Sequence, residues 1–132
     1  MEGIILLDTC VLFDFLAGKN KLVVAPVERA LLEANAAVSV VTVFELLRGV
    51  ESEKHMAQRK ELIGLCTVLD LTPAISERAA GIYTHLKKKG ALIHMEDILI
   101  AATALHWHYA VLTLNTKDFL RIPGVRTTIQ TV

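Results

Sequence analysis

Four acidic side chains occupy positions from which they could do chemistry together. Asp8 ends an apolar run, Glu45 follows a second one, Asp97 begins a long apolar stretch, and Asp118 follows a last apolar segment. Carboxylate oxygens suit hard divalent cations, so such a set could hold Mg²⁺ or Mn²⁺. A cation would also neutralise the repulsion among crowded negative charges. The pattern indicates metal-assisted chemistry, provided that the fold gathers the four residues.

Each of these acids also has a purely structural interpretation. Asp8 could cap a helix. Glu45 completes a capping-box pattern with Thr42. Asp97 could cap its helix or favour the positive end of the helix dipole, and Asp118 falls in the first turn of a short helix, where acids are common. Taken singly, each is better explained in this way. Four caps at one rim would concentrate negative charge without a neutralising partner, so we favour the joint functional interpretation.

The elements that must position the acids are short apolar strands alternating with helices. This order predicts an α/β fold, in which a parallel sheet carries helices on both faces and the site lies beyond the carboxyl ends of the strands. The expected strands cover residues 3–8, 37–41, 67–70 and 110–114, with a last edge strand at 125–129. The expected helices cover 9–17, a segment with Pro26 in its first turn, 42–48 capped by Thr42, 54–65, 73–89, 97–107 and 116–120.

Length and composition are consistent with one domain spanning residues 1–132. They also argue against a strongly basic nucleic-acid binder, a disulfide-rich secreted protein and a membrane protein. Lysine plus arginine number 14 and aspartate plus glutamate number 14, so no overall basic field draws in nucleic acid. Hydrophobic residues make up 53%, which is ample for a core. Two cysteines form no disulfide framework, and no apolar run is long enough for a membrane span. We therefore expect a cytoplasmic protein with no membrane association.

Four segments together resemble the PIN-domain family, specifically the VapC-type toxin ribonucleases of toxin–antitoxin pairs. They are LLDT at 6–9, VFELLRG at 43–49, DILIAATA at 97–104 and TLNTKDF at 113–119, in the order in which the family has them. The resemblance implies a PIN-like three-layer α/β/α sandwich with a mostly parallel central sheet. It also implies Mg²⁺-dependent endoribonuclease activity, with Mn²⁺ as an expected substitute.

The resemblance also assigns roles to residues of this chain. It places Asp8, Glu45, Asp97 and Asp118 in the acidic metal site, with Thr9 and Asn115 as polar supports. Cys10 stands where members often carry Asn, and we expect little effect from it. Glu96 is either an extra carboxylate of the site or a residue without a role in it. Helix geometry turns it about 100° away from Asp97.

The chemistry of phosphodiester hydrolysis suggests a role for each of the four acids. Water attacks in line while carboxylates hold one or two Mg²⁺ ions. Asp8 and Asp97 are the leading ligand candidates, and Glu45 and Asp118 would bind a second ion or orient its water. Arg48 is a candidate phosphate contact, with a surface salt bridge as its structural alternative. The four phenylalanines, at positions 13, 15, 44 and 119, are expected in the core rather than as base-stacking platforms.

Two other functions fit parts of the sequence. A receiver-like signalling domain would use Asp70 as phosphate acceptor and Lys117 as its basic partner, but it leaves Glu45 and Asp97 without a role. A PIN ribonuclease could also mature RNA without an antitoxin. For the toxin we expect an RNA substrate, a homodimer, and an antitoxin that lays an apolar segment in a groove of the early helices and a cation near the acids.

Overall fold

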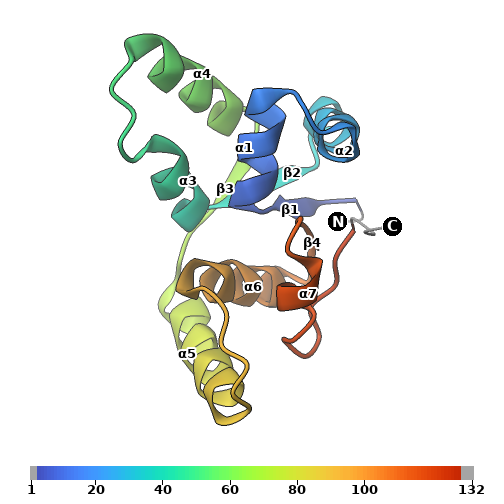
Figure 1. The fold of residues 1–132 in the computed structure, drawn as a ribbon, viewed down its shortest axis with the longest axis vertical. Helices are drawn as coiled ribbons and strands as arrows, with labels where there is room; N and C mark the ends of the chain where they lie inside the picture. Colours follow the sequence, from blue (N-terminus) through green and yellow to red (C-terminus); the bar gives the residue numbers. More distant parts are fainter. Residues whose placement is uncertain (1–2, 129–132) are drawn as a thin grey trace.

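The computed structural model describes residues 3–128, in which short strands and helices alternate as expected (Figure 1). The strands are β1 (Ile5–Leu7), β2 (Ala36–Ser39), β3 (Thr67–Leu69) and β4 (Ala110–Leu112). The helices are α1 (Thr9–Ala17), α2 (Lys21–Leu32), α3 (Val40–Leu47), α4 (Glu53–Gly64), α5 (Pro73–Lys88), α6 (Met95–Trp107) and α7 (Thr116–Phe119).

The strands form one parallel sheet in the order β3-β2-β1-β4. Its central strand, β1, pairs with both β2 and β4, so that Leu6 lies opposite Ala37 on one side and Val111 on the other. The strands are apolar without alternation because helices bury both faces of the sheet. All four carboxyl ends point the same way, which brings the residues after β1, β2 and β4 to one edge.

Two hydrophobic cores lie on opposite faces of the sheet, so the expected three-layer α/β/α sandwich is confirmed. Successive residues of β1 separate into them: Leu6 packs with α5 and α6, whereas Leu7 packs with α1 to α4. Figure 1 shows the same division, with α1 to α4 on one side of the strands and α5 to α7 on the other. The near-continuous apolar character of α6 follows from its burial between the sheet and α5.

Helices α2 and α3 begin before the residues at which the sequence predicted their first turns. Helix α2 starts at Lys21, because the Asn20 side chain caps it by accepting from the Leu22 backbone N–H at 3.0 Å; Pro26 therefore lies inside the helix. Helix α3 starts at Val40, because Ser39 is its N-cap and accepts from the Val41 N–H at 3.1 Å. The capping box that the sequence suggested for Thr42 and Glu45 is therefore wrong, and both residues are free for other contacts.

The chain differs from expectation at its last strand as well. The predicted edge strand at 125–129 is reduced to a single parallel bridge between Thr127 and Val111, and residue 129 lies outside the described residues. Within residues 3–128, no helix has the length and apolar character that crossing a bilayer requires.

Candidate functional site

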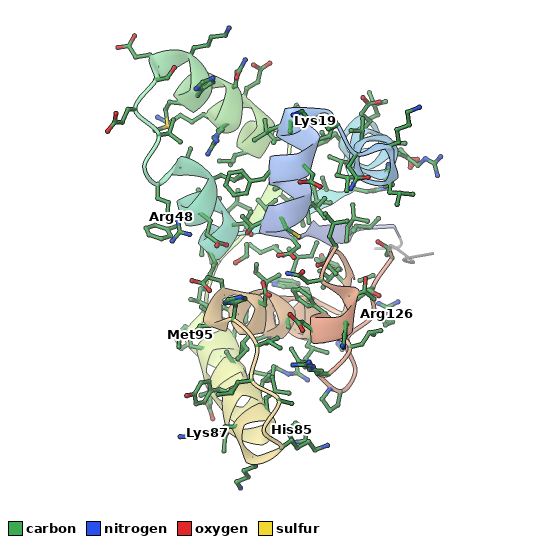
Figure 2. All side chains as sticks on the ribbon, viewed as in Figure 1. Lys19, Arg48, His85, Lys87, Met95 and Arg126 are labelled. Carbon is green, nitrogen blue, oxygen red and sulfur yellow. The ribbon has the colours of Figure 1, made fainter. Side chains whose placement is uncertain are left out.

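A pocket of about 370 Å³ lies at the carboxyl edge of the sheet, where the sequence argument placed a site. It is formed by the start of α1, by α3, by the start of α6 and by the segment after β4. Figure 2 shows Arg48 at the end of α3 and Met95 at the start of α6 on the same side of the molecule. The residues that line the pocket are Asp8, Thr9, Cys10, Phe13, Glu45, Arg48, His94, Glu96, Asp97 and Asn115.

Asp8 is 2% exposed, and donors fix both of its carboxylate oxygens. Oδ1 accepts from the Thr9 backbone N–H at 2.8 Å, so Asp8 is the N-cap of α1 as the structural interpretation suggested. Oδ2 accepts from the Thr113 hydroxyl at 2.7 Å and from the Cys10 thiol at 3.1 Å. The Thr113 oxygen in turn accepts from the Asn115 N–H at 2.9 Å. The Asp8 side chain therefore caps α1 and lines the pocket at the same time.

Glu45 is held by a chain of two hydroxyls. The Thr9 hydroxyl donates to Glu45 Oε1 at 2.7 Å and lies 3.0 Å from the Thr42 hydroxyl. Thr9 has one hydroxyl proton and gives it to Glu45, so Thr42 must donate to Thr9. The other carboxylate oxygen, Oε2, lies 3.9 Å from Arg48 Nη2. The surface salt bridge suggested for Arg48 therefore forms, and its guanidinium still lines the pocket.

Asp97 is held differently from Asp8 and Glu45. Helix α6 begins at Met95 after His94, which places Asp97 inside the first turn rather than at the cap. Its Oδ2 is buried and has no hydrogen-bond partner within residues 3–128. Burial, and then the negative charge of Asp8, raise the pKa of this carboxyl to about 7; His94 opposes the shift, while Asp118 and Glu45 add to it.

Asp118 is not among the residues that line the pocket. It belongs to the short helix α7, is about one-third exposed, and sits 3.9 Å from Arg121 in an ion pair. Its charge still acts on Asp97, so it is part of the same electrostatic environment. Of the four predicted acids, the fold therefore places three in the pocket wall and the fourth outside it.

The carboxylates of the acidic pocket are the kind of ligand that a hard cation prefers, although they do not form a complete metal site by themselves. Among the residues that the structure describes, no three His, Cys, Asp or Glu side chains form a group that could hold a metal ion. Mg²⁺ commonly takes only one or two carboxylates and completes its shell with water and substrate phosphate. A buried carboxylate oxygen without a donor is costly, and a cation beside Asp97 Oδ2 would remove that cost.

Two residues that support the site were missed from sequence, which also left the part of Glu96 open. Thr113 and Thr42 were not singled out as supports, although Thr113 lies where a polar residue follows a buried strand. Glu96 lines the pocket despite its helical offset from Asp97. Cys10 donates to Asp8, and burial together with that negative charge raises the pKa of its thiol to about 12, so it acts as a neutral donor.

The prediction that all four phenylalanines belong to the core is wrong for two of them. Phe119 is fully buried and Phe15 packs against the core of α1 to α4. Phe13 is 39% exposed and lines the pocket, and Phe44 is 63% exposed. Both belong to apolar helical segments, in which sequence alone does not reveal that one face is left open.

Asp70, the acceptor that a receiver domain would need, follows the edge strand β3. It is exposed and lies outside the acidic pocket. Its expected partner Lys117 is also exposed. The geometry therefore does not favour the receiver alternative.

Comparison with known proteins yields one consistent group. A model of the PIN domain matches residues 5–125. Ribonuclease VapC of Rickettsia bellii is 37% identical over 95 residues, 67% of this chain and 71% of that protein. Ribonuclease VapC1 of Methanocaldococcus jannaschii is 32% identical over 122 residues, 92% of this chain and 82% of that protein. The crystal structure of DNA-bound VapBC from Salmonella typhimurium superposes with a TM-score of 0.83 at 26% identity, covering 95% of this chain and 96% of that chain.

Proposed function

Because this chain belongs to the PIN-domain family, as a VapC-type ribonuclease toxin of a toxin–antitoxin module, we propose that it hydrolyses RNA with Mg²⁺ or Mn²⁺ in the acidic pocket. The observation that carries this proposal is the buried Oδ2 of Asp97, which has no hydrogen-bond partner among residues 3–128 and shares its pocket with Asp8 and Glu45. An unsatisfied carboxylate oxygen with two further acids in the same pocket is a costly arrangement if the acids are only structural, and a divalent cation would stabilise it.

The contacts of each residue suggest its role in the reaction. Asp8 and Asp97 are the proposed first ligands, and Glu45 and Asp118 would bind a second ion or orient water. When bound, the ion supplies activation of the attacking water and neutralises charge in the transition state. Thr9 and Thr113 keep the carboxylates of Glu45 and Asp8 in place. Arg48 and Asn115, at the pocket wall, would contact the phosphate and the ligand shell.

We also propose an antitoxin partner and a homodimer. The solved relative from Salmonella typhimurium is a VapBC complex. Helices α1 and α2 of this chain expose Leu16 and Leu22, and the end of α2 exposes Leu32, which would receive an apolar antitoxin segment. A basic antitoxin side chain would suit the acids in the pocket. Maturation of RNA without an antitoxin is the second candidate, and recovery of the toxin alone from its native operon would favour it.

Asp97→Asn tests the metal site. Asn preserves the shape of Asp97 but removes its charge, so we expect a loss of Mg²⁺- or Mn²⁺-dependent cleavage of single-stranded RNA of at least about 100-fold, the upper end of what outer ligand partners contribute. Mg²⁺ at 100 times its Kd should stabilise the wild type by about 2.7 kcal/mol and the variant by much less.

Asp70→Asn is the matched control, since it makes the same chemical change at an exposed residue outside the pocket. It should keep both cleavage and the metal-induced rise in Tm. If Asp97→Asn cleaved RNA at the wild-type rate and kept the full metal-induced rise, Asp97 would have no part in the mechanism and the proposal would fail.

A further inference from the structure

A second pocket of about 380 Å³ adjoins the acidic one, between α1, α3 and α4. The two pockets share Phe13, Glu45 and Arg48, so they form one continuous surface. Their chemical character differs. The acidic pocket has four acids against Arg48 and His94, whereas the second has two acids against Arg48, His55 and Arg59. A strand of RNA whose phosphate reached the acids would therefore continue into a less negative region.

Phe13 stands between the two pockets with its ring braced. The Arg59 guanidinium lies over the ring, 5.1 Å from its centroid, and is itself anchored by donation to the Leu46 carbonyl at 2.6 Å. Phe13 is 39% exposed, whereas its neighbours Val11 and Leu12 on the same helix are fully buried. An exposed aromatic ring that a cation holds in place is a pre-organised surface for stacking a nucleobase.

We propose that Phe13 stacks the unpaired base of a nucleotide that flanks the scissile phosphate, while Arg48 contacts the adjoining backbone phosphate. The inference rests on the proposed ribonuclease function and adds to it a residue that binds a base of the RNA. A base paired within a helix cannot present its face to a side chain, whereas a base in a loop or a single strand can. Arg48 is suited to its role because its side chain is 57% exposed at the shared wall.

Steady-state cleavage of a single-stranded RNA oligonucleotide tests the role of the ring. Phe13→Leu keeps apolar bulk but removes the stacking face, so KM should rise about 5-fold or more, with a smaller change in kcat. Phe13→Trp should restore the wild-type KM. Tyr83→Leu is the control, since Tyr83 is an exposed aromatic residue on α5 that belongs to neither pocket. Its KM should not change.

Substrates that lack one base identify the partner of the ring. In oligonucleotides with a stable abasic analogue at one or the other position flanking the cleaved bond, one of the two should raise the KM of the wild type as Phe13→Leu does. The same abasic substrate should leave the KM of Phe13→Leu unchanged, because the two changes remove one contact. Additive losses at both positions would overturn the stacking proposal.

A fluorescence measurement separates this inference from the nuclease proposal. In an Asp97→Asn, Trp107→Phe background, Phe13→Trp gives a single tryptophan at the site, and we expect added single-stranded RNA to quench it. Tyr83→Trp in the same background should not be quenched, since position 83 lies on α5 outside both pockets. Absence of quenching at position 13, with a wild type that cleaves RNA, would overturn the stacking site alone. Quenching by RNA with a wild type that does not cleave would retain the site and reject the nuclease proposal.

Discussion

The titration of Asp97 should be visible in the stability of the metal-free protein. Burial and neighbouring acids raise its pKa from 3.8 to about 7 in the folded state. Between pH 4 and 7 the unfolded chain loses this proton while the folded protein keeps it, so stability falls as pH rises and levels off above about 7. The shift corresponds to at most roughly 4 kcal/mol.

Asp97→Asn isolates this contribution because it removes the titrating group and keeps the shape. In EDTA, urea unfolding should show equal stabilities near pH 4 and a variant that is the more stable of the two at pH 8. A difference in stability that stayed constant across this range would show that Asp97 titrates normally in the folded protein.

Thr113 has a positioning role that can be separated from its burial. Its hydroxyl donates to Asp8 and accepts from the Asn115 N–H. Thr113→Val should cost about 1–3 kcal/mol of stability by leaving polar groups unpaired, and should lower cleavage roughly 10- to 100-fold. The matched control is Thr103→Val, at an equally buried threonine that donates to the Leu99 carbonyl inside α6. Equal activity losses in both variants would mean that cleavage follows stability and not the orientation of Asp8.

In helix α3, different residues cap the helix and support the site. Ser39 is the N-cap, and Thr42 contacts the Thr9 hydroxyl that holds Glu45. Ser39→Ala should lower the free energy of unfolding by about 1 kcal/mol and leave the Glu45 contacts in place. Thr42→Val should instead lower cleavage, roughly 10-fold or more, because the Thr9 hydroxyl that holds Glu45 loses its donor. Measuring kcat and unfolding for both variants checks this. If Ser39→Ala lost activity and Thr42→Val did not, Thr42 would have no part in holding Glu45.

For the whole molecule, we expect a two-fold dimer at micromolar concentration. Large apolar side chains stay exposed on several helices, among them Leu32 at 87% and Met95 at 63%. Exposed apolar surface of this kind favours association, and most soluble homo-oligomers have two-fold symmetry. Sedimentation equilibrium should give a mass near twice the 14.5 kDa of one chain. A mass near that of one chain across this concentration range would contradict the expectation.

Local patterns in the sequence determined the architecture and the edge at which the site lies. Short apolar runs such as 4–7 and the helix signals between them required a parallel sheet covered on both faces. In such a sheet the carboxyl ends meet at one edge, so polar residues directly after strands converge. Asp8, Glu45 and Asp97 were predicted at one rim on this basis, and all three line the same pocket.

Only the tertiary structure decided what each side chain does there. Asp118 lies on a short helix, pairs with Arg121 and does not line the pocket, whereas Thr42 contacts Thr9 across 33 positions of the chain. Phe13 is exposed because α1, α3 and α4 leave an opening between them. The Oδ2 atom of Asp97 likewise has no partner within the described part of the chain because no donor there, however distant in sequence, is placed within reach of it. Such contacts join segments far apart in sequence, and the periodicity and capping signals of each segment carry no information about them.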